Sequence, residues 1–404
     1  MTRSVLSVEE VRKAVFEAAE LPLSRAITLP PETYVDPGFF AHEADAVLSR
    51  GWICLAHVSQ LKKSGDYLRL DLLGEPVVVI RGRDGEIRVL SRVCPHRGAD
   101  ILHPVFGGPE EGNEPILVCP YHRWSFEADG ALKGCPEMQK AEGFDKKDWR
   151  LSSFRSEIWQ GFVFVNVSGD AAPLAELYAA FADMIAPWDT AEMEVVIELK
   201  WDCDFNWKVM VENWIESYHH LGIHHQTLNT SMPAAMTWTD PEQGHFIRCH
   251  LPFNKKTTEK VMEAAAKDAA LDGFKPVAGL PLDRQLEWGL YLGLPCFMLL
   301  TARDRVIWYR LLPQSEGRCA LLTTTLVTRA AMADPDFAET VAAETTMLRD
   351  FHLEDMQVNA AMQAGLRSSK VVRGRLSHLE EPIWHIQRYL ARSLRVAEPA
   401  SPSV

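Results

Sequence analysis

The stretch from Cys94 to His122 constrains this chain more than any other, because it holds two short pairs of one cysteine and one histidine. The first pair is Cys94 with His96, and the second is Cys119 with His122. Thiolates and imidazoles at such spacings are typical metal ligands. Each pair needs a tight turn to direct its side chains to one place. The residues that supply turn chemistry here are Pro95, Gly98 and Pro120.

Two kinds of metal centre use two cysteines and two histidines. One is a structural zinc site, but zinc fingers usually carry the two cysteines together, followed by the two histidines. Here each pair mixes the two ligand types. In a Rieske [2Fe–2S] centre, two cysteines hold one iron and two histidines hold the other. The mixed pairs therefore favour a Rieske cluster held by Cys94, His96, Cys119 and His122, with a zinc knuckle as the alternative.

The composition is that of a large globular protein. Of the 404 residues, 47% are hydrophobic and 24% are charged, and the length suffices for two or three domains. The formal net charge of −13 argues against a nucleic-acid or anionic-membrane partner, because either would require a basic surface. The eight cysteines are too scattered for a disulfide framework. Since a signal peptide and a run of ~18 apolar residues are also lacking, we expect a cytoplasmic protein.

The first 170 residues carry mainly strand and turn signals after an initial helical region. Ser7 and Glu10 have the spacing of a capping box, so a helix is expected to begin there. Runs of β-branched and aromatic residues predict strands, and Asp-Gly pairs predict hairpin turns. These signals predict an all-β domain over residues 41–167, preceded by a helical segment, residues 1–40, that packs on the next domain. The predictions are a second helix at 38–50, strands at 66–70, 76–81, 87–90 and 161–166, and turns at 83–85 and 128–130.

Beyond residue 170 the pattern changes to longer helices mixed with strands. The predicted fold class is therefore α+β, with an all-β Rieske domain and a second domain, residues 168–404, of antiparallel sheet with packed helices. Residues 391–404 are predicted to form a frayed tail. The predicted helices are 204–220, 336–364 and 382–394, and the predicted strands are 194–200, 305–312 and 320–328.

A second metal site is indicated where the predicted helix over 204–220 ends. His219 closes the helical pattern, and His224 follows it closely enough for a turn to direct both imidazoles to one ion. Two histidines and one carboxylate form the facial triad that leaves positions open on Fe(II) for O₂ and substrate. A zinc site and an exposed histidine-rich surface are the alternatives for this segment taken alone.

The two patterns together resemble the Rieske-type non-haem iron oxygenases, specifically the terminal oxygenase alpha subunits of the aromatic ring-hydroxylating family. Residues 206–225 are similar to the family signature Asn-Trp-Lys…Glu-Asn…Asp/Glu-x-x-His-x₄-His. The resemblance implies that His219 and His224 bind a mononuclear iron. His220 and His225 fall outside the matching register, so they are not expected to be ligands.

One departure from the family pattern is visible in the cluster region. His96 and Cys119 are separated by 22 residues, several more than the family usually carries. We expect the surplus in the polar stretch 105–115, because a loop rich in glycine and proline can lengthen without disturbing the ligands.

The third iron ligand implied by the resemblance is Asp355, because residues 353–368 match a recurring Glu-Asp…Gln-x-Gly-x-x-Ser pattern. Glu354 would point about 100° away from Asp355 on a helix. We expect Glu354 to be solvated or to support a ligand from the second layer of the site. His352, one turn before Asp355, is a candidate partner of that carboxylate. An exposed acidic pair is the alternative interpretation of Glu354 and Asp355.

The resemblance also implies roles for Glu216 and Asn213. Glu216 lies one helical turn before His219, so its carboxylate can accept the spare N–H of that imidazole. In related oxygenases the acid at this position also reaches a Rieske histidine of the neighbouring subunit, here His122, across a head-to-tail ring, and a homotrimer is implied. Asn213 is implied to lie near the iron, with a buried amide bonded to backbone as the alternative.

These features predict a terminal oxygenase that activates O₂ at mononuclear Fe(II) with electrons from its Rieske cluster. No Gly-x-Gly-x-x-Gly dinucleotide motif follows a strand, so we expect electrons from NAD(P)H through a separate reductase, with a ferredoxin as a further candidate. The predicted reaction is hydroxylation, by mono- or dioxygenation, or oxidative demethylation of a small aromatic or N-/O-methylated substrate. The alternatives are a Rieske electron-transfer or ligand-binding protein without oxygenase activity, and a zinc-stabilised interaction protein.

Aromatic and methionine side chains between His224 and Asp355 are candidates for a substrate pocket. They suit a flat ring, and they equally suit a quaternary ammonium held by cation–π attraction. The alternative for each of them is a place in the hydrophobic core. They are Met236, Trp238, Trp288, Tyr291, Phe297, Met298 and Trp308.

Overall fold

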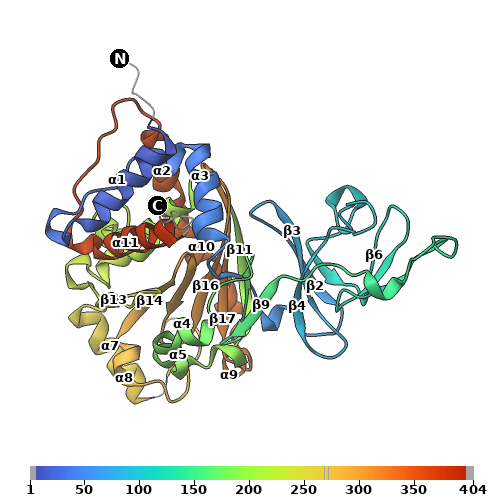
Figure 1. Cartoon of the computed structure of the whole chain (residues 1–404). Coiled ribbons are helices and arrows are strands. Elements are labelled where there is room, and N and C mark those ends of the chain that lie inside the picture. Colours follow the sequence, from blue (N-terminus) through green and yellow to red (C-terminus); the bar gives the residue numbers. More distant parts are fainter. Residues whose placement is uncertain (1–5, 268, 272, 397–404) are drawn as a thin grey trace. The chain divides into compact units, whose positions relative to one another are not determined.

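The computed structural model describes residues 6–267, 269–271 and 273–396. The chain forms two compact units (Figure 1). The small unit is Trp52–Pro173, and the large unit combines Met1–Gly51 with Leu174–Val404. The predicted domain boundaries, after residues 40 and 167, stay predictions.

The small unit contains three antiparallel sheets, which confirms an all-β fold for this part of the chain. Gly85 and Gly130 adopt positive φ angles of 85° and 88° in the two predicted hairpin turns, where glycine avoids the steric cost of a side chain. Glu111–Asn113 pairs with a neighbouring strand, so the stretch predicted as a loop over 105–115 is partly strand. The sheets are β1–β10–β9, β4–β3–β2–β5 and β6–β7–β8. Their strands are β1 Ile53–His57, β2 Asp66–Leu72, β3 Glu75–Arg81, β4 Ile87–Ser91, β5 Glu111–Asn113, β6 Ile116–Val118, β7 Ser125–Glu127, β8 Leu132–Gly134, β9 Arg155–Trp159 and β10 Phe162–Asn166.

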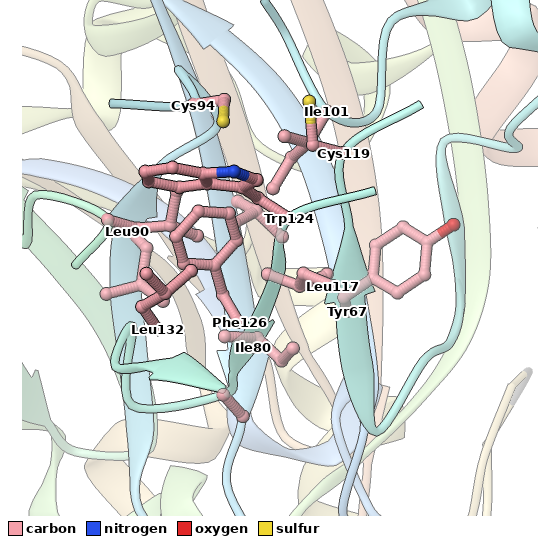
Figure 2. Packing of buried hydrophobic residues seen from close by; sticks show 13 residues of the cluster. Tyr67, Ile80, Leu90, Cys94, Ile101, Leu117, Cys119, Trp124, Phe126 and Leu132 are labelled. Atoms are coloured by element: carbon pink, nitrogen blue, oxygen red, sulfur yellow. The ribbon is translucent and has the colours of Figure 1, made fainter. Parts of the chain in front are cut away.

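The hydrophobic core of the small unit lies directly beneath the two cysteine–histidine pairs. Trp124 and Phe126 are buried, and both belong to the cluster of core residues that includes Cys94 and Cys119. Figure 2 shows the two sulfur atoms on the same side of the Trp124 ring. Packing of these large rings, which removes much apolar surface from water, therefore also fixes the position of the cysteines.

A seven-stranded antiparallel sheet forms the centre of the large unit, with the order β11-β17-β16-β15-β14-β13-β12. The predicted strands 194–200, 305–312 and 320–328 correspond to β11, β16 and β17. The other four were not predicted, and three of them are buried along their whole length or most of it. Two of these three, β14 and β15, also lack the polar alternation of a half-exposed strand. The strands are β11 Glu194–Cys203, β12 Trp238–Thr239, β13 Phe246–Pro252, β14 Glu287–Gly293, β15 Phe297–Thr301, β16 Val306–Ser315 and β17 Arg318–Val327.

Helices from the two ends of the chain pack against each other in the large unit. α1 (Val8–Glu20) contacts α11 (Glu381–Val396), seen in blue and red in Figure 1. The predicted capping box is confirmed, because Ser7 Oγ accepts from Glu10 N at 3.3 Å and Glu10 Oε2 accepts from Ser7 N at 2.8 Å. The predicted fraying from residue 391 is wrong as far as Val396, which α11 includes, and residues 397–404 lie outside the described residues.

Several helices contact the large sheet, and two of them carry predicted site residues. α6 (Trp207–Ile215), which carries Asn213, contacts β14 and β16, and α10 (Phe337–Leu366), which carries Asp355, contacts β11. α8 (Leu282–Gln285) contacts β14, and α11 contacts β13. The helix predicted over 204–220 is therefore shorter at both ends.

The helix predicted over 38–50 is α3 (Pro37–Glu43) followed by a π-helical turn, Ala44–Leu48. Among the described helices, none is long and apolar enough to cross a membrane. The remaining helices are α2 Glu32–Val35, α3 Pro37–Glu43, α4 Leu174–Leu177, α5 Ala179–Ile185, α7 Lys255–Ala266, α8 Leu282–Gln285 and α9 Arg329–Met332.

A fully buried ion pair joins α6 to α3. Lys208 Nζ lies 2.7 Å from Glu43 Oε2, and both side chains have no exposed surface. The indole Nε1 of Trp207 donates to the same oxygen at 2.9 Å. Trp207 and Lys208, which belong to the signature seen in the sequence, therefore hold the N-terminal helices against α6 rather than lining a site.

Candidate functional site

The two cysteine–histidine loops of the small unit have the same backbone hydrogen-bond pattern. Cys94 N donates to Ala99 O at 2.8 Å, and Cys119 N donates to Trp124 O at 2.7 Å, so each cysteine bonds to the residue five positions later. The fourth residue after each cysteine donates back to the cysteine carbonyl. That residue has positive φ in both loops, 75° at Gly98 and 64° at Arg123. Gly98 was expected from the sequence, whereas Arg123 was not, because nothing in its side chain signals a left-handed conformation.

The side chains of these loops suit an iron–sulfur cluster. The Cys94 and Cys119 thiols are free and buried, and burial raises the pKa of Cys94 to about 11. The rings of His96 and His122 have their centroids 4.6 Å apart, and His96 stacks on Trp124 at 4.8 Å. Among the described residues, the buried His122 Nδ1 has no hydrogen-bond partner. A buried nitrogen without a partner is costly unless a ligand or metal satisfies it.

The four side chains provide two ligands of each type, two thiols and two imidazoles. In a Rieske cluster two thiolates hold one iron and two imidazoles hold the other, so this set matches a binuclear cluster.

A group of potential metal ligands in the large unit consists of His219, His224 and Asp355. His224 Nε2 lies 3.1 Å from Asp355 Oδ1, and His219 Nε2 lies 3.7 Å from the same oxygen. His224 and Asp355 are buried and His219 is partly buried. The structure thus brings together the three residues that the sequence predicted as iron ligands, and two imidazoles with one carboxylate are the donor set that Fe(II) takes in facial triads.

The two histidines are placed by the end of α6 and the turns that follow it. α6 ends at Ile215; the next residue, Glu216, has extended backbone angles, and Tyr218–Leu221 form a short 3₁₀ turn that contains His219. The Glu216 carboxylate accepts from the backbone N–H groups of Tyr218 and His219 and thereby fixes the turn. His219 therefore reaches the site from a turn, not from the helix that was predicted to continue through it.

Each of the two histidines has its second ring nitrogen bonded to a glutamate. Glu216 Oε1 lies 2.7 Å from His219 Nδ1, and Glu354 Oε2 lies 2.6 Å from His224 Nδ1. Thr227 Oγ1 also donates to Glu354 Oε2 at 3.1 Å. A carboxylate at Nδ1 fixes the imidazole tautomer that leaves Nε2 free for a metal. Both Nε2 atoms face Asp355, so the orientation of the rings fits a shared ion.

The electrostatics of the triad favour an ionised Asp355. Burial alone would raise the pKa of Asp355, but the hydrogen bond from His224 and the charge of the two histidines outweigh burial and lower it. Burial likewise opposes the charged form of His224, yet Asp355 and Glu354 outweigh burial and raise the pKa of this imidazole. A cation at this place is therefore stabilised by two carboxylates, and a metal ion can take the place of the proton.

The remaining predicted residues lie close to the triad without joining it. His220 is buried beside His219, with ring centroids 4.8 Å apart, and burial lowers its pKa to about 3. His225 is exposed and bonds to Gly222 O through Nδ1. Both ring nitrogens of His352 bond elsewhere, to Leu348 O and to Tyr309 Oη. The charge of His352 nevertheless acts to lower the pKa of Asp355, and its suggested role as an outer partner of that carboxylate stays a prediction.

Asn213 is bonded to a second amide. Its Oδ1 accepts from Asn359 Nδ2 at 3.3 Å, and it lines a cavity together with Glu216 and His219. The side chain thus shares a cavity with two other predicted site residues, and its place near an iron stays a prediction. Its partner is the Asn359 side chain, which could not be anticipated from the sequence because the two residues lie on different helices, α6 and α10.

A cavity of about 710 Å³ approaches the triad from the side of His224. Thr227, whose hydroxyl lies 3.4 Å from His224 Nδ1, and Phe351, whose ring centroid lies 6.5 Å from that of His224, form the nearer wall. Of the seven predicted pocket side chains only Trp288 lines this cavity. Of the other six, two are exposed at the surface, Met236 and Trp238. The remaining four are buried within the sheet: Tyr291, Phe297, Met298 and Trp308.

Comparisons with known proteins agree with both halves of this architecture. Residues 51–154 match the Rieske [2Fe–2S] domain family, and residues 190–395 match the ring hydroxylating alpha subunit (catalytic domain) family. The chain is 31% identical over 255 residues to a carnitine monooxygenase oxygenase subunit of Acinetobacter pittii, and this match covers 62% of the chain and 66% of that relative. It is 26% identical over 367 residues to a glycine betaine monooxygenase oxygenase subunit of Chromohalobacter salexigens, covering 84% of the chain and 80% of that relative.

The fold agrees with solved structures over nearly the whole chain. A quaternary ammonium Rieske monooxygenase superposes with a TM-score of 0.76 and 23% identity, covering 97% of this chain and 99% of that one. The catalytic-domain match alone spans just over half of the 404 residues. The chain therefore belongs to the ring-hydroxylating alpha subunits, the Rieske non-haem iron oxygenases.

Proposed function

We propose that this chain is a terminal oxygenase component that oxidises a small N-methylated substrate with O₂. The observation that carries the proposal is the convergence of His219, His224 and Asp355 in a unit joined to a second unit with two matched cysteine–histidine loops. An electron-transfer protein would need only the loops. The triad, with a carboxylate behind each histidine, supports an oxygenase instead.

We assign the cofactors to the residues that fit them. Cys94, His96, Cys119 and His122 would hold the [2Fe–2S] cluster, and His219, His224 and Asp355 would hold Fe(II). When bound, the cluster would supply single electrons, and the mononuclear Fe(II) would offer open positions for O₂. The chain itself orients the imidazoles through Glu216 and Glu354 and keeps Asp355 ionised at the site.

Electrons would come from NAD(P)H through a separate reductase, with a ferredoxin as a further candidate. Within the oxygenase, we propose that Glu216 connects His219 to the cluster histidine His122 of a neighbouring copy, in a homotrimer. Its bond to His219 Nδ1 supports this role. So do the large apolar side chains exposed in the segment that follows it, since an exposed apolar patch is typical of an interface. These are Tyr218, Leu221, Met236 and Trp238. A related fold has been described in the context of inter-subunit electron transfer.

The substrate class rests on the relatives and on the walls of the cavity beside His224. Both curated relatives named above are oxygenase subunits for quaternary ammonium compounds, carnitine and glycine betaine. In this chain Phe253, Trp288 and Phe351 line the cavity, and aromatic faces attract an N-methylated cation. Asp304 and Glu344 line the same cavity, but both pair with Arg305, so the aromatic side chains alone favour a cation there.

The experiment is turnover with ¹⁸O₂ in the presence of a surrogate reductase from a quaternary ammonium monooxygenase system. Glycine betaine, carnitine and other N-methylated amines are compared with biphenyl and naphthalene, and Asp355→Ala serves as the inactive control. The proposal expects O₂ consumption and labelled oxygen in products of the N-methylated compounds. Labelled diols from the hydrocarbons alone would instead favour ring hydroxylation. Reduction of the cluster without any substrate oxidation would leave only an electron carrier.

A further inference from the structure

A second cavity of the large unit reaches the triad from the side of His219. His219 and its hydrogen-bond partner Glu216 both line this cavity. Its volume is about 400 Å³, and α6, α10, α11 and the segment before α2 contribute to its walls. Val372 and Met362 also line it, with 81% and 41% of their surfaces exposed, so the cavity communicates with solvent. Three carboxyl groups line this one space: Glu212, Glu216 and Glu380.

The carboxyl group of Glu212 is buried and hydrogen-bonded to a tyrosine. Its side chain is buried, and both of its oxygens lie within hydrogen-bond distance of Tyr34 Oη, at 2.8 and 2.9 Å. A phenol has one proton to donate, so it satisfies one carboxylate oxygen at a time. The second oxygen is therefore free to carry a proton of its own.

The charged groups around Glu212 do not give it a counterion. The nearest cation by sequence, Lys208, is taken by Glu43 at 2.7 Å, and among the described residues no ion pair joins Glu212 to a basic side chain. Burial therefore raises the pKa of Glu212 to about 7; Tyr34 and Lys208 oppose this, and Glu43 and Glu380 add to it. Near neutral pH the group is poised between its two forms, neutral below that pKa and anionic above it.

We propose that Glu212 is a proton-binding group coupled to reduction of the catalytic site: it takes one proton from solvent through this cavity when an electron arrives, and releases it when the electron leaves. The inference rests on the proposed function, which supplies the electron from the reductase. In each cycle one O–H bond forms on the Glu212 carboxylate and the same bond later breaks, with solvent as source and acceptor of the proton.

The size of the coupling follows from the distance. Glu212 and His219 line the same cavity of about 400 Å³, so a charge added at the catalytic site acts on Glu212 over roughly 10 Å. One negative charge added at that distance, with an effective dielectric constant of about 20, strengthens proton binding by about tenfold. A group already poised near neutrality then changes from partly to mostly protonated. A carboxyl with an ordinary pKa would remain ionised and take up no proton.

The first part of the test uses the metal-free protein and infrared spectroscopy. The carbonyl band of a protonated carboxylic acid should titrate with a midpoint near pH 7 in the wild type and be missing in Glu212→Gln. Tyr34→Phe removes the hydrogen bond that favours the anion, so it should move the midpoint to higher pH. Glu380→Gln, in the same cavity, should keep the Glu212 band. A wild-type spectrum without a band that depends on Glu212 overturns the proposal.

The second part measures protons bound per electron when the holoprotein is reduced near pH 7 with a pH-indicator dye present. The wild type and Glu380→Gln should take up more protons than Glu212→Gln. Equal uptake by wild type and Glu212→Gln overturns the coupling. If Glu212→Gln does not fold, Tyr34→Phe still decides, because its uptake must shift to higher pH. Failure of the proposed function would look different, since it would leave proton uptake intact while no substrate is oxidised.

Discussion

Glu354 Oε2 lies 2.6 Å from Nδ1 of His224, while Nε2 of the same ring lies 3.1 Å from Oδ1 of Asp355. Two consecutive residues of α10 thus contact the two ring nitrogens of one imidazole. Their side chains point about 100° apart around the helix axis, and the His224 ring lies between the two carboxylates. Glu354 therefore has a defined place behind a candidate ligand and is not merely an exposed neighbour of Asp355.

The first prediction concerns this bond. Glu354→Gln should weaken iron binding by about 10–100-fold, because the amide can no longer hold His224 in the metal-binding tautomer as firmly. Competition with a chelator measures the affinity. Asp350→Asn, one turn earlier on the exposed side of α10, is the matched control and should bind iron like the wild type. Equal affinities in both variants would show that the contact with His224 has no influence on the metal.

The second prediction concerns the buried pair of Lys208 and Glu43. Lys208→Met should lower the free energy of unfolding by about 3–5 kcal/mol, because it leaves the Glu43 carboxylate buried without its cation. The double variant Lys208→Met with Glu43→Gln removes both charges and should recover part of the loss. Urea unfolding is measured for the wild type, the two single variants and the double variant. A double variant as unstable as the sum of the single changes would mean that the two side chains do not interact.

The third prediction concerns the core under the cluster loops. Phe126 is fully buried, so Phe126→Ala should destabilise the small unit by about 3–5 kcal/mol and promote loss of the cluster on heating. Loss of visible absorption during a thermal ramp reports the effect. Phe106, which is 59% exposed, provides the control, and Phe106→Ala should change stability by less than about 0.5 kcal/mol. Similar melting of both variants would argue against the core as the support of the loops.

Much of the architecture is predictable from the sequence because local signals and packing agree. The capping box at Ser7 begins a helix where the spacing indicated, and α10 covers the long helical pattern from 336 to 364. The three predicted residues His219, His224 and Asp355 converge, because the resemblance covered their spacing as well as their type. Such agreement between levels is typical of natural sequences.

The parts that escaped prediction depend on contacts between distant residues. α6 ends at Ile215 because the carboxylate of the next residue, Glu216, caps the following turn, and helical periodicity does not encode this. Arg123 takes a left-handed conformation because the cysteine loop closes around it. The strands β14 and β15 are buried in the sheet and lack alternation. Tertiary structure decides each of these features, so propensity alone cannot reveal them.

The fourth prediction concerns Glu216. Glu216→Gln keeps the shape of the side chain and an oxygen for His219, so both metal centres should be retained. The cluster should reduce normally, yet transfer of its electron to the catalytic iron should slow by orders of magnitude if Glu216 is the connection. Rapid-mixing absorption spectroscopy follows the cluster, with Glu381→Gln as the control from the adjoining cavity. An unchanged transfer rate would exclude Glu216 from the path.

The most direct test of two distinct metal centres is the iron and acid-labile sulfide content of anaerobically purified protein, wild type and Asp355→Ala. The wild type should contain a [2Fe–2S] cluster plus one further iron. Asp355→Ala should lose only that further iron, because two imidazoles alone hold Fe(II) weakly, and should keep its sulfide and red-brown colour. Zinc in place of iron, with no labile sulfide in either protein, would exclude both iron centres.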